Sequence, residues 1–232
     1  MLLAFLIPKG LQTVDIAFNF ENKNIVLTID SVVVAGWTGR NLAAVQHHID
    51  ELAELGIAPP SQVPLYYRTS IAQLTQSGNI EVLGEGTSGE VEPLLIRSGG
   101  TTYFGLASDH TDRDLEAYSV AASKQACAKP IAADLWDFDD ISDHADDIRL
   151  RCWIEEKGQE VLYQDGSLAD IRPLAELCDG AGLADGTAML CGTFTAIEGV
   201  RPARSYRMEA LAPRSGRTIT LSYVVKTLPI IS

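Results

Sequence analysis

Residues 89–114, GEVEPLLIRSGGTTYFGLASDHTDRD, are the stretch from which the fold of this chain is predicted. Residues 90–96 and 101–104 are short runs rich in apolar, β-branched or aromatic side chains, and Ser98-Gly99-Gly100 is a turn signal between them. We therefore predict two strands joined by a turn. The polar run at 108–114 follows, and we expect it to begin a helix, because Ser, Asp and Thr are good N-caps.

Further strands are predicted on both sides of this stretch. The segments 24–29 and 32–35 are β-branched and short, and the region from 65 to 106 is strand-rich, with a strand at 79–83. A hairpin is predicted around Lys157-Gly158, with strands at 148–154 and 160–163. We interpret the apolar start, residues 1–10, as a buried first strand, because it is too short for a membrane span and lacks a basic signal-peptide region.

Three helices are predicted among these strands. Apolar residues at helical spacing indicate a helix over 39–55, which Gly56 can end. A second helix is expected over 112–123, and a third begins at a Ser167 cap and ends near Gly180. The chain lacks a regular alternation of strand and helix, so we predict a β-dominated α+β fold with a few inserted helices. One domain spanning 1–232 is expected, with N-terminal strands in 1–31 and a catalytic core in 32–232.

The composition favours a globular domain with a substantial core over a nucleic-acid or membrane-surface protein. The 232 residues are 46% hydrophobic and carry a formal net charge of −13. A strongly acidic chain repels phosphate backbones and anionic lipids, so we expect no nucleic-acid or membrane partner. The four cysteines are Cys127, Cys152, Cys178 and Cys191. They show no zinc-site spacing, so we predict reduced thiols in a cytoplasmic protein.

Three carboxylates form the candidate metal site. Residues two apart in a strand face the same way, so Glu90 and Glu92 present two carboxylates on one face, roughly 7 Å apart. Carboxylate oxygens are the ligands that Mg²⁺ and Mn²⁺ prefer, and Asp109 could supply a third. Taken alone, a Glu-x-Glu strand is more often a solvated face, and the 108–114 run more often a capped helix start.

The order of several motifs resembles the fumarylacetoacetate hydrolase family. That family carries a Glu-x-Glu strand, an Asn-Asp-x-Thr-x-Arg-Asp segment, a lysine, and a Gly-Asp…Thr-Gly-Thr-Pro turn. Here the same order is found in Gly89-Glu90-Val91-Glu92, in Ser108-Asp109-His110-Thr111-Asp112-Arg113-Asp114, in Ser123-Lys124-Gln125, and in residues 185–194. Weaker matches are Tyr66-Tyr67-Arg68-Thr69-Ser70 and Tyr163-Gln164-Asp165-Gly166. The resemblance covers residue 32 to the C-terminus.

The resemblance implies a mixed β-roll like the C-terminal domain of that family, commonly a homodimer, with a Mg²⁺ or Mn²⁺ site. Its ligands would be Glu90, Glu92 and Asp109, and Lys124 would lie beside a small carboxylate-bearing oxo-acid. Thr193 would hold the substrate carboxylate through its hydroxyl and backbone amide. The remaining substrate-binding candidates that the matched positions imply are Gly192, Arg68 and Gln164.

The general base is less well defined by the sequence. The family often has Asn-Tyr-x-x-His-x-x-Glu after its first Gly-containing strand, whereas this chain has residues 36–41, GWTGRN, with no histidine. His48 and Glu51 form a later His-x-x-Glu, and on a helix the two side chains can touch. A surface pair without catalytic role is the alternative. His110 is a second candidate base, or a histidine that only makes hydrogen bonds at the helix start.

These expectations point to three functions. The first is a metal-dependent hydrolase that cleaves a carbon–carbon bond in an acylpyruvate-like dioxo-acid, with His48, Glu51 and Lys124 as catalytic residues. The second is a decarboxylase, hydratase or enol–keto isomerase acting on a related oxo-acid. The third is a non-catalytic relative that binds metal and ligand. Lys124, and Arg68 or Arg40, are the candidates to offset the negative charge of the ligand.

Overall fold

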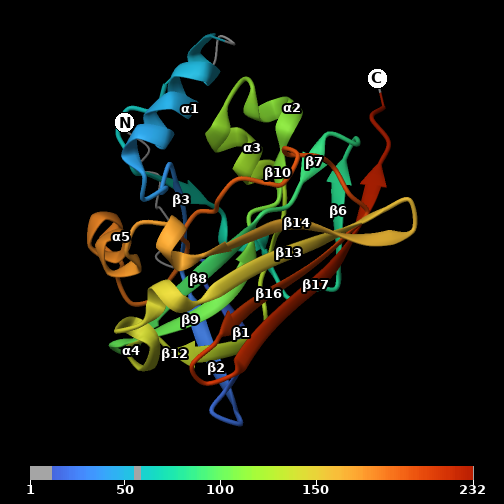
Figure 1. Ribbon diagram of the computed structural model, residues 1–232. Coiled ribbons are helices and arrows are strands. Elements are labelled where there is room, and N and C mark those ends of the chain that lie inside the picture. Colours follow the sequence, from blue (N-terminus) through green and yellow to red (C-terminus); the bar gives the residue numbers. More distant parts are fainter. Residues whose placement is uncertain (1–11, 55–58, 232) are drawn as a thin grey trace, which may run out of the picture.

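The computed structural model describes residues 12–54 and 59–231 (Figure 1). The strand predicted at residues 1–10, and the helix end predicted at Leu55 and Gly56, lie outside these residues. Eight strands form the larger sheet in the order β2-β1-β12-β9-β8-β15-β3-β4. Their bounds are Val14–Phe20 (β1), Lys23–Ile29 (β2), Ser31–Gly36 (β3), Leu65–Thr69 (β4), Val91–Ser98 (β8), Thr101–Ser108 (β9), Asp134–Asp137 (β12) and Thr187–Leu190 (β15).

A second sheet of five strands has the order β14-β13-β16-β17-β6. Its strands are Asn79–Leu83 (β6), Arg149–Glu156 (β13), Gln159–Ser167 (β14), Ser205–Ala212 (β16) and Arg217–Leu228 (β17). Two short pairs join the sheets to the helical segments: β7 (Thr87–Ser88) with β10 (Thr111–Asp112), and β5 (Leu74–Thr75) with β11 (Lys129–Pro130). Both parallel and antiparallel pairs occur, so the architecture is mixed.

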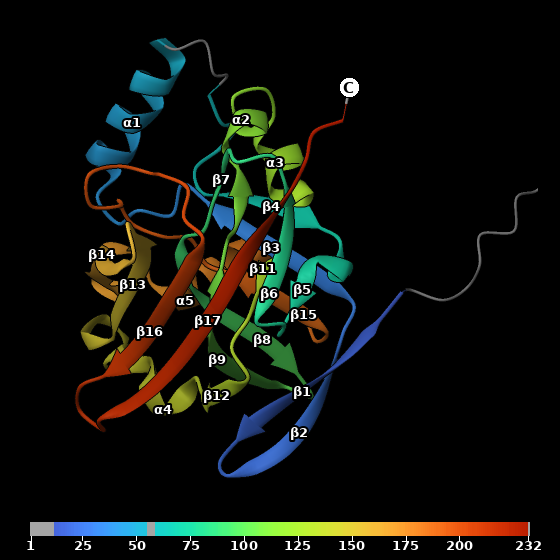
Figure 2. The same ribbon diagram turned by 90° about the vertical axis from the view of Figure 1, so that its right-hand side faces the viewer.

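The alternation of side chains along β8 explains why the larger sheet is buried on both faces. Leu95 points into an apolar cluster between the two sheets, together with Met189, Tyr206 and other residues. Leu94 and Ile96 point into a second cluster, which contains the inward side chains of β1 and β2. Because β1 and β2 belong to the same sheet as β8, the sheet curls back on itself as a roll. Figure 2 shows this hairpin extending from the lower part of the molecule.

The predicted hairpin turn is confirmed, and its geometry follows from the sequence. Lys157 and Gly158 have φ values of 53° and 78° between β13 and β14. Two consecutive positive φ values are the signature of the type I′ turn, whose twist suits a two-residue hairpin. The predicted strands at 24–29, 32–35 and 79–83 are also present as β2, β3 and β6.

The helices differ from the prediction in two places. The first predicted helix is present as α1 (Leu42–Glu54), which begins three residues later than predicted, with the Asn41 side chain accepting from the amides of Ala43 and Ala44. The helix predicted over 112–123 is two short ones, α2 (Arg113–Glu116) and α3 (Val120–Ala126), because Ser119 caps a new helix by accepting from Ala122 N.

The helix predicted from Ser167 to Gly180 is also divided. Ser167 and Asp170 form a capping box on a single 3-10 turn, Leu168–Asp170, and Pro173 separates this turn from α5 (Leu174–Ala181). Gly182 ends α5 with φ 61°, a left-handed conformation that glycine adopts without steric cost. A fifth helix, α4 (Asp139–Ser142), and two further 3-10 turns, Ile71–Gln73 and Ala145–Asp147, complete the described elements. The β-dominated α+β prediction is confirmed.

Candidate metal and substrate site

The β8–β9 pair brings the predicted carboxylates to one end of the larger sheet. Glu92 lies opposite Ala107, and Val91 lies opposite Ser108. Asp109 follows β9 directly, and its amide donates to the carbonyl of Glu90 at 3.0 Å. The antiparallel register therefore brings Asp109, which is distant in sequence, to the same strand end as Glu90 and Glu92.

Asp109 is the centre of a buried charge cluster. Its side chain is fully buried and is paired with two ammonium groups, Lys124 at Oδ2 and Lys129 at Oδ1, the latter at 3.0 Å. Burial by itself would raise the pKa of the Asp109 carboxyl, but the two lysines outweigh it and hold that pKa well below its usual value. Burial likewise opposes the charge of Lys124, yet Asp109 and Glu92 raise the pKa of its ammonium.

The two glutamates have different environments. Glu92 is 2% exposed and accepts from the backbone amide of Gly192 at 2.8 Å. Burial, and then the negative charge of Asp109, raise the pKa of the Glu92 carboxyl well above its usual value. Glu90 is 15% exposed, and its carboxylate meets the guanidinium of Arg113 at 3.1 Å. Each carboxylate is thus held by a donor on a different segment.

The donor set fits a hard dication in chemistry and in backbone position, because it consists of three carboxylates at one strand end. Glu90 and Asp109 are turned toward protein cations, whereas Glu92 accepts from a backbone amide. Within residues 12–54 and 59–231, no three His, Cys, Asp or Glu side chains stand together in a ready ligand geometry. For Glu90, Glu92 and Asp109 to share one ion, Glu90 must leave Arg113 and Lys124 must withdraw from Asp109 Oδ2.

The side chains of Gln164 and Thr193 form hydrogen bonds within the protein, and their predicted contacts with the substrate, including that of the Thr193 backbone amide, stay predictions. Gln164 is fully buried, and its amide accepts from Val91 N and donates to Thr193 Oγ1 and Phe194 O. The hydroxyl proton of Thr193 is in turn donated to Val91 O at 2.7 Å. Because a hydroxyl has one proton, the Thr193 side chain has none left to donate to a substrate carboxylate. The two side chains instead join β14 and the 192–194 turn to β8.

Gly192, in contrast, has a position that only glycine can fill. Its φ is 91°, and a Cβ placed there would lie 1.8 Å from Thr38 Oγ1. This close approach of Thr38 aligns the Gly192 amide with Glu92. The predicted contact of Gly192 with the substrate stays a prediction, since its amide is donated to the candidate ligand Glu92.

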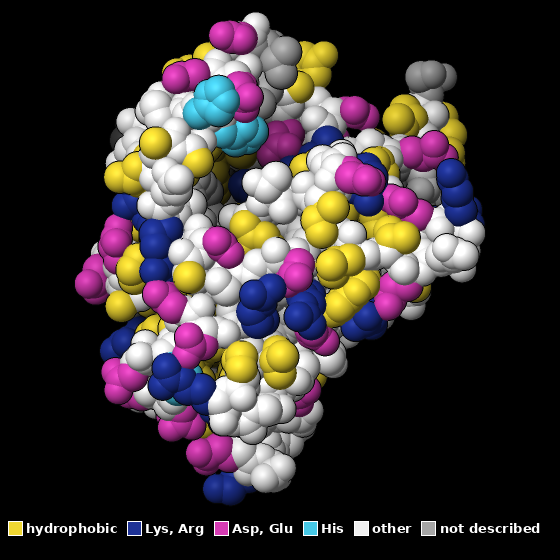
Figure 3. Space-filling view, in the orientation of Figure 1, with side chains coloured by type: hydrophobic (Ala, Val, Ile, Leu, Met, Phe, Trp, Pro, Cys, Tyr) yellow, Lys and Arg dark blue, Asp and Glu magenta, His cyan; other side chains and the backbone are white. Residues whose placement is uncertain are grey.

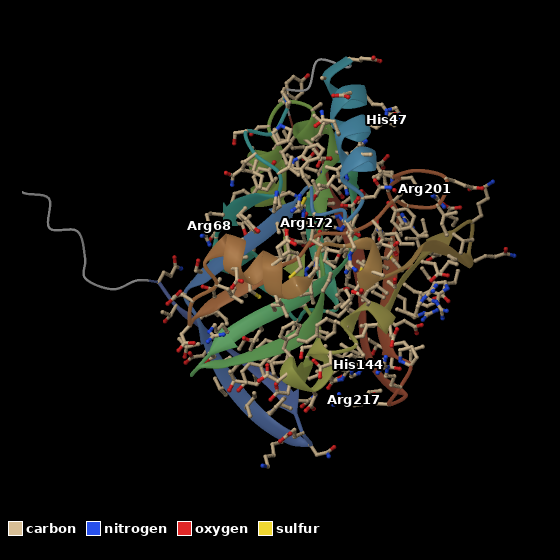
Figure 4. The ribbon with its side chains drawn as sticks, turned by 60° about the vertical axis from the view of Figure 1, so that its left-hand side comes forward. His47, Arg68, His144, Arg172, Arg201 and Arg217 are labelled. Atoms are coloured by element: carbon tan, nitrogen blue, oxygen red, sulfur yellow. The ribbon has the colours of Figure 1, made fainter. Side chains whose placement is uncertain are left out.

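Arg68 and Arg40 are not brought to the cluster. Neighbouring residues on a strand face opposite sides, and it is Tyr67 whose ring lies 5.8 Å from the Lys124 ammonium. Arg68 instead lines a surface hollow with Asp30 and Ser70, and Figure 4 shows it well apart from His47 on α1. Arg40 forms a bidentate pair with Asp146 and donates to backbone carbonyls near α5. The charge-offsetting groups are therefore Lys124, Lys129 and Arg113.

His48 and Glu51 form the predicted pair on α1. His48 Nδ1 lies 3.6 Å from Glu51 Oε2, and Glu51 also meets His47 at 3.3 Å. The side chains of His48 and Glu51 are 62% and 57% exposed. Figure 3 shows the histidines of α1 beside a hollow in the surface. The pair is thus largely exposed, and its catalytic role stays a prediction.

His110, the second candidate base, is enclosed by the protein. It is fully buried, with Nδ1 3.0 Å from Tyr223 Oη and Nε2 2.9 Å from Thr87 Oγ1. Burial, followed by the charges of Lys129 and Arg113, lowers the pKa of the His110 imidazole to about 3. Both ring nitrogens are engaged by protein hydroxyls, so the structure favours the hydrogen-bonding interpretation over the base.

Lys129 is the member of the buried charge cluster that the sequence reasoning missed. It lies in β11 with no exposed surface, and its ammonium donates to the carbonyl of His110 as well as to Asp109. The available signal was a single lysine inside an otherwise apolar run, residues 126–133. Such a lysine is almost never fully buried unless it is paired, and a partner could have been sought among the nearby acids.

The comparisons with known proteins agree with this architecture. A family model described as "Protein of unknown function (DUF2848)" matches residues 35–223. A candidate fumarylpyruvate hydrolase from Burkholderia cenocepacia has a similar fold, with a TM-score of 0.63 and 17% identity over 97% of this chain and 100% of that one. No curated protein sequence matches this chain.

Two further solved structures hold ligands. A fumarylpyruvate hydrolase from Pseudomonas aeruginosa, in complex with Mn²⁺ and pyruvate, has a TM-score of 0.59 and 16% identity, covering 92% of this chain and 97% of that one. A 2-keto-3-deoxy-D-arabinonate dehydratase complexed with magnesium and 2,5-dioxopentanoate has a TM-score of 0.61 and 16% identity, covering 86% and 74%. These likenesses confirm the fumarylacetoacetate hydrolase fold. Across the described helices, none is long and apolar enough to cross a membrane.

Proposed function

The chain belongs to the family described as proteins of unknown function (DUF2848), and we propose that it is a Mg²⁺- or Mn²⁺-dependent enzyme that hydrolyses a carbon–carbon bond in a small acylpyruvate-like dioxo-acid. The observation that supports this most is the convergence of Glu90, Glu92, Asp109 and Lys124 at one strand end. Three segments of the chain contribute, and Glu92, Asp109 and Lys124 are withdrawn from solvent.

Burying these charged groups is costly, which supports a functional origin. The two buried carboxylates, Glu92 and Asp109, disfavour each other's ionisation. Each buried ion also loses several kcal/mol of hydration free energy, and the attraction within a well-formed buried ion pair only about offsets this loss. A protein that needed only stability would do as well with apolar side chains of similar volume. Strongly shifted pKa values at one buried cluster are typical of catalytic and metal-binding sites.

The residues that would hold the dication are Glu90, Glu92 and Asp109, and a bound Mg²⁺ or Mn²⁺ supplies Lewis acidity to the oxo-acid. Lys124, released from Asp109, is placed to stabilise negative charge on the substrate. His48, supported by Glu51, accepts a proton from water, whose oxygen attacks the distal carbonyl carbon. The carbon–carbon bond then breaks, and its electron pair leaves with the pyruvate part as an enolate. The hydroxyl of the water stays on the acyl carbon as a carboxylic acid, and His48 returns its proton to the enolate carbon to give pyruvate.

A second candidate is a lyase or isomerase, that is, a decarboxylase, a hydratase or an enol–keto isomerase, on a related oxo-acid. The exposure of His48 and Glu51 favours keeping it, because a base that far into solvent must move or be covered before it can activate a single water. An enolate-stabilising cluster made of Glu90, Glu92, Asp109 and Lys124 serves these reactions without that base. A relative that binds metal without turnover is the third outcome.

Substrate assays with purified protein separate the three. We expect cleavage of a simple acylpyruvate in the presence of Mg²⁺ or Mn²⁺. The reaction is monitored through the loss of the diketone absorbance and the formation of pyruvate. Decarboxylation of oxaloacetate without diketone cleavage would support the second candidate. Binding of Mn²⁺ and oxalate with neither reaction would support the third and would contradict enzymatic activity on these compounds.

The metal assignment has its own test in Glu92→Gln. The substitution keeps the shape of a buried side chain and removes its charge, so we expect a folded protein that has lost Mn²⁺ binding, measured by electron paramagnetic resonance of the free ion, and activity. The matched control is Glu81→Gln, because Glu81 is exposed on β6 and pairs only with Lys226. Unchanged Mn²⁺ affinity in Glu92→Gln would remove Glu92 from the site.

We also expect the protein to be cytoplasmic and to form a homodimer. Light scattering tests the homodimer.

A further inference from the structure

The segment 36–40, GWTGR, has no role in the function proposed above, although it connects β3 to α1. Trp37 in this segment has a φ of 61°, in the left-handed region. A bulky residue in this region is a true outlier, which the surrounding structure has to enforce. Such strained positions cluster at functional sites.

The contacts of Trp37 join two parts of the candidate site. Its indole Nε1 lies 3.4 Å from the hydroxyl of Tyr67, and its ring lies 5.9 Å from that of His48, tilted by 45°. The ring of Tyr67 is in turn 5.8 Å from the Lys124 ammonium. Trp37 and Tyr67 therefore form a continuous aromatic bridge from Lys124, at the carboxylate cluster, to His48 on α1.

The residues around Trp37 fix its position. A Cβ at Gly36 would meet the Tyr67 ring at 2.9 Å, so glycine is needed there for Tyr67 to lie close against β3. Thr38 is buried against Gly192, and Arg40 is tied to Asp146 and to the carbonyls of Leu168 and Ile171. The segment is thus anchored on both sides of Trp37, and its strain cannot relax by a local shift.

Helix α1 itself has few other attachments. Ile49 is buried, whereas the described side chains of its remaining residues are half-buried or exposed. Figure 2 shows α1 standing at the top of the molecule beside few other elements. The position of His48 therefore depends strongly on contacts at the base of the helix. Trp37 provides such a contact, and it belongs to neither apolar cluster of the described core.

We propose that Trp37 is a positioning residue, which, held by Tyr67, sets where His48 stands relative to Lys124. The proposal rests on the assignment of His48 as the base. Trp37 is half-buried, so part of the residue remains accessible to a ligand. The acyl arm of the dioxo-acid would lie along this aromatic bridge, which favours short planar or apolar arms over charged ones.

The test uses Trp37→Gly, which removes the indole and at the same time relieves the strained backbone. We therefore expect a folded protein with an unchanged or higher melting temperature. For acylpyruvate cleavage we expect kcat to fall by about 10²-fold, because displacing a catalytic group by about 1 Å has an effect of that size. The KM and the Mn²⁺ affinity should change little. Trp37→Phe, which keeps an aromatic ring beside His48, should restore most of kcat.

Lys157→Gly is the matched control. Lys157 also has a positive φ, 53°, but lies in the β13–β14 turn and is exposed. It should show the same relief of strain without any change in kcat. A Trp37→Gly variant with wild-type kcat, or a Trp37→Phe variant as impaired as Trp37→Gly, would overturn the proposal.

A second measurement keeps the inference separate from the proposed function. The imidazole resonance of His48, assigned with His48→Gln, should differ from that of exposed His47 in the wild type because of the nearby indole. In Trp37→Gly it should move toward the His47 position, and amide exchange in α1 should become faster. These changes without any diketone cleavage would support the positioning and refute only the hydrolase. An unchanged His48 resonance would overturn the positioning itself.

Discussion

The substitution Lys129→Met provides the sharpest test of the buried charge cluster. Lys129 is fully buried and donates both to Asp109 Oδ1, at 3.0 Å, and to the carbonyl of His110. Methionine has a similar length and no charge, so the substitution removes the ammonium without opening a large cavity. It leaves a carboxylate oxygen and a carbonyl buried with one donor fewer each.

The expected loss of stability can be worked out from these contacts. Removing one partner of a buried ion pair costs about 3–5 kcal/mol. Asp109 keeps its second pair with Lys124, so we expect the lower end, about 3 kcal/mol. For a chain of this size each kcal/mol lowers the melting temperature by about 2–4 °C, which gives a fall of about 6–12 °C.

The assay measures the free energy of unfolding in urea, monitored by circular dichroism, for the single variants and for the double variant of a mutant cycle. In Asp109→Asn/Lys129→Met both charges are absent, so the loss should be smaller than the sum of the single losses by at least about 1 kcal/mol. Lys226→Met is the matched control, because Lys226 forms an exposed pair with Glu81 and should contribute about 0–1 kcal/mol. If Lys129→Met proved as stable as Lys226→Met, the reasoning on buried charge would be refuted.

Two further predictions concern the groups around the cluster. Gln164→Leu leaves Val91 N and Phe194 O without their partner, so we expect a loss of at least about 2 kcal/mol in urea unfolding. Gln159→Leu, on the exposed end of β14, should change stability by less than about 0.5 kcal/mol, and equal effects of the two would contradict the role of Gln164. The pKa of His110 is lowered from 6.5 to about 3, so the unfolded chain takes up the proton first as the pH falls. The stability contributed by neutral His110 is complete above pH 6.5 and is lost toward pH 3, by up to about 1.4 kcal/mol per pH unit. His110→Gln should therefore show a flatter dependence of unfolding free energy on pH, and parallel curves would exclude this contribution.

The sequence was sufficient to predict several of the strands and the fold class. The positive-φ turn at Lys157-Gly158, the β-branched runs at β2 and β3, and the order of the short motifs each depend on neighbours within a few residues. Local signals of this kind survive folding because the tertiary structure uses the same preferences. The helix boundaries were less well predicted, since Ser119 and Pro173 compete with the helical periodicity around them.

The roles of polar side chains depended on contacts that the sequence does not show. Thr193 and Gln164 are predicted to bind substrate, and in the structure their side chains bond to β8, to each other and to Phe194 O, so that role stays a prediction. Arg68 was assigned by its place in a motif, yet the strand turns Tyr67 toward Lys124 instead. A motif gives the residue type at a position, whereas its free hydrogen-bonding capacity depends on every element packed against it.

The sequence by itself predicted a strand over the segment that contains Glu92, a further strand that ends just before Asp109, and a β-dominated chain. Those features arise from the period of two along a strand and from turn chemistry, both of which act over short distances. Only the tertiary structure decided that Lys129 and Arg113 neutralise these carboxylates, that His110 is enclosed, and that Trp37 stands between Lys124 and His48. Charge pairing and burial join residues from separate segments, and only the packing of the whole chain brings those segments together.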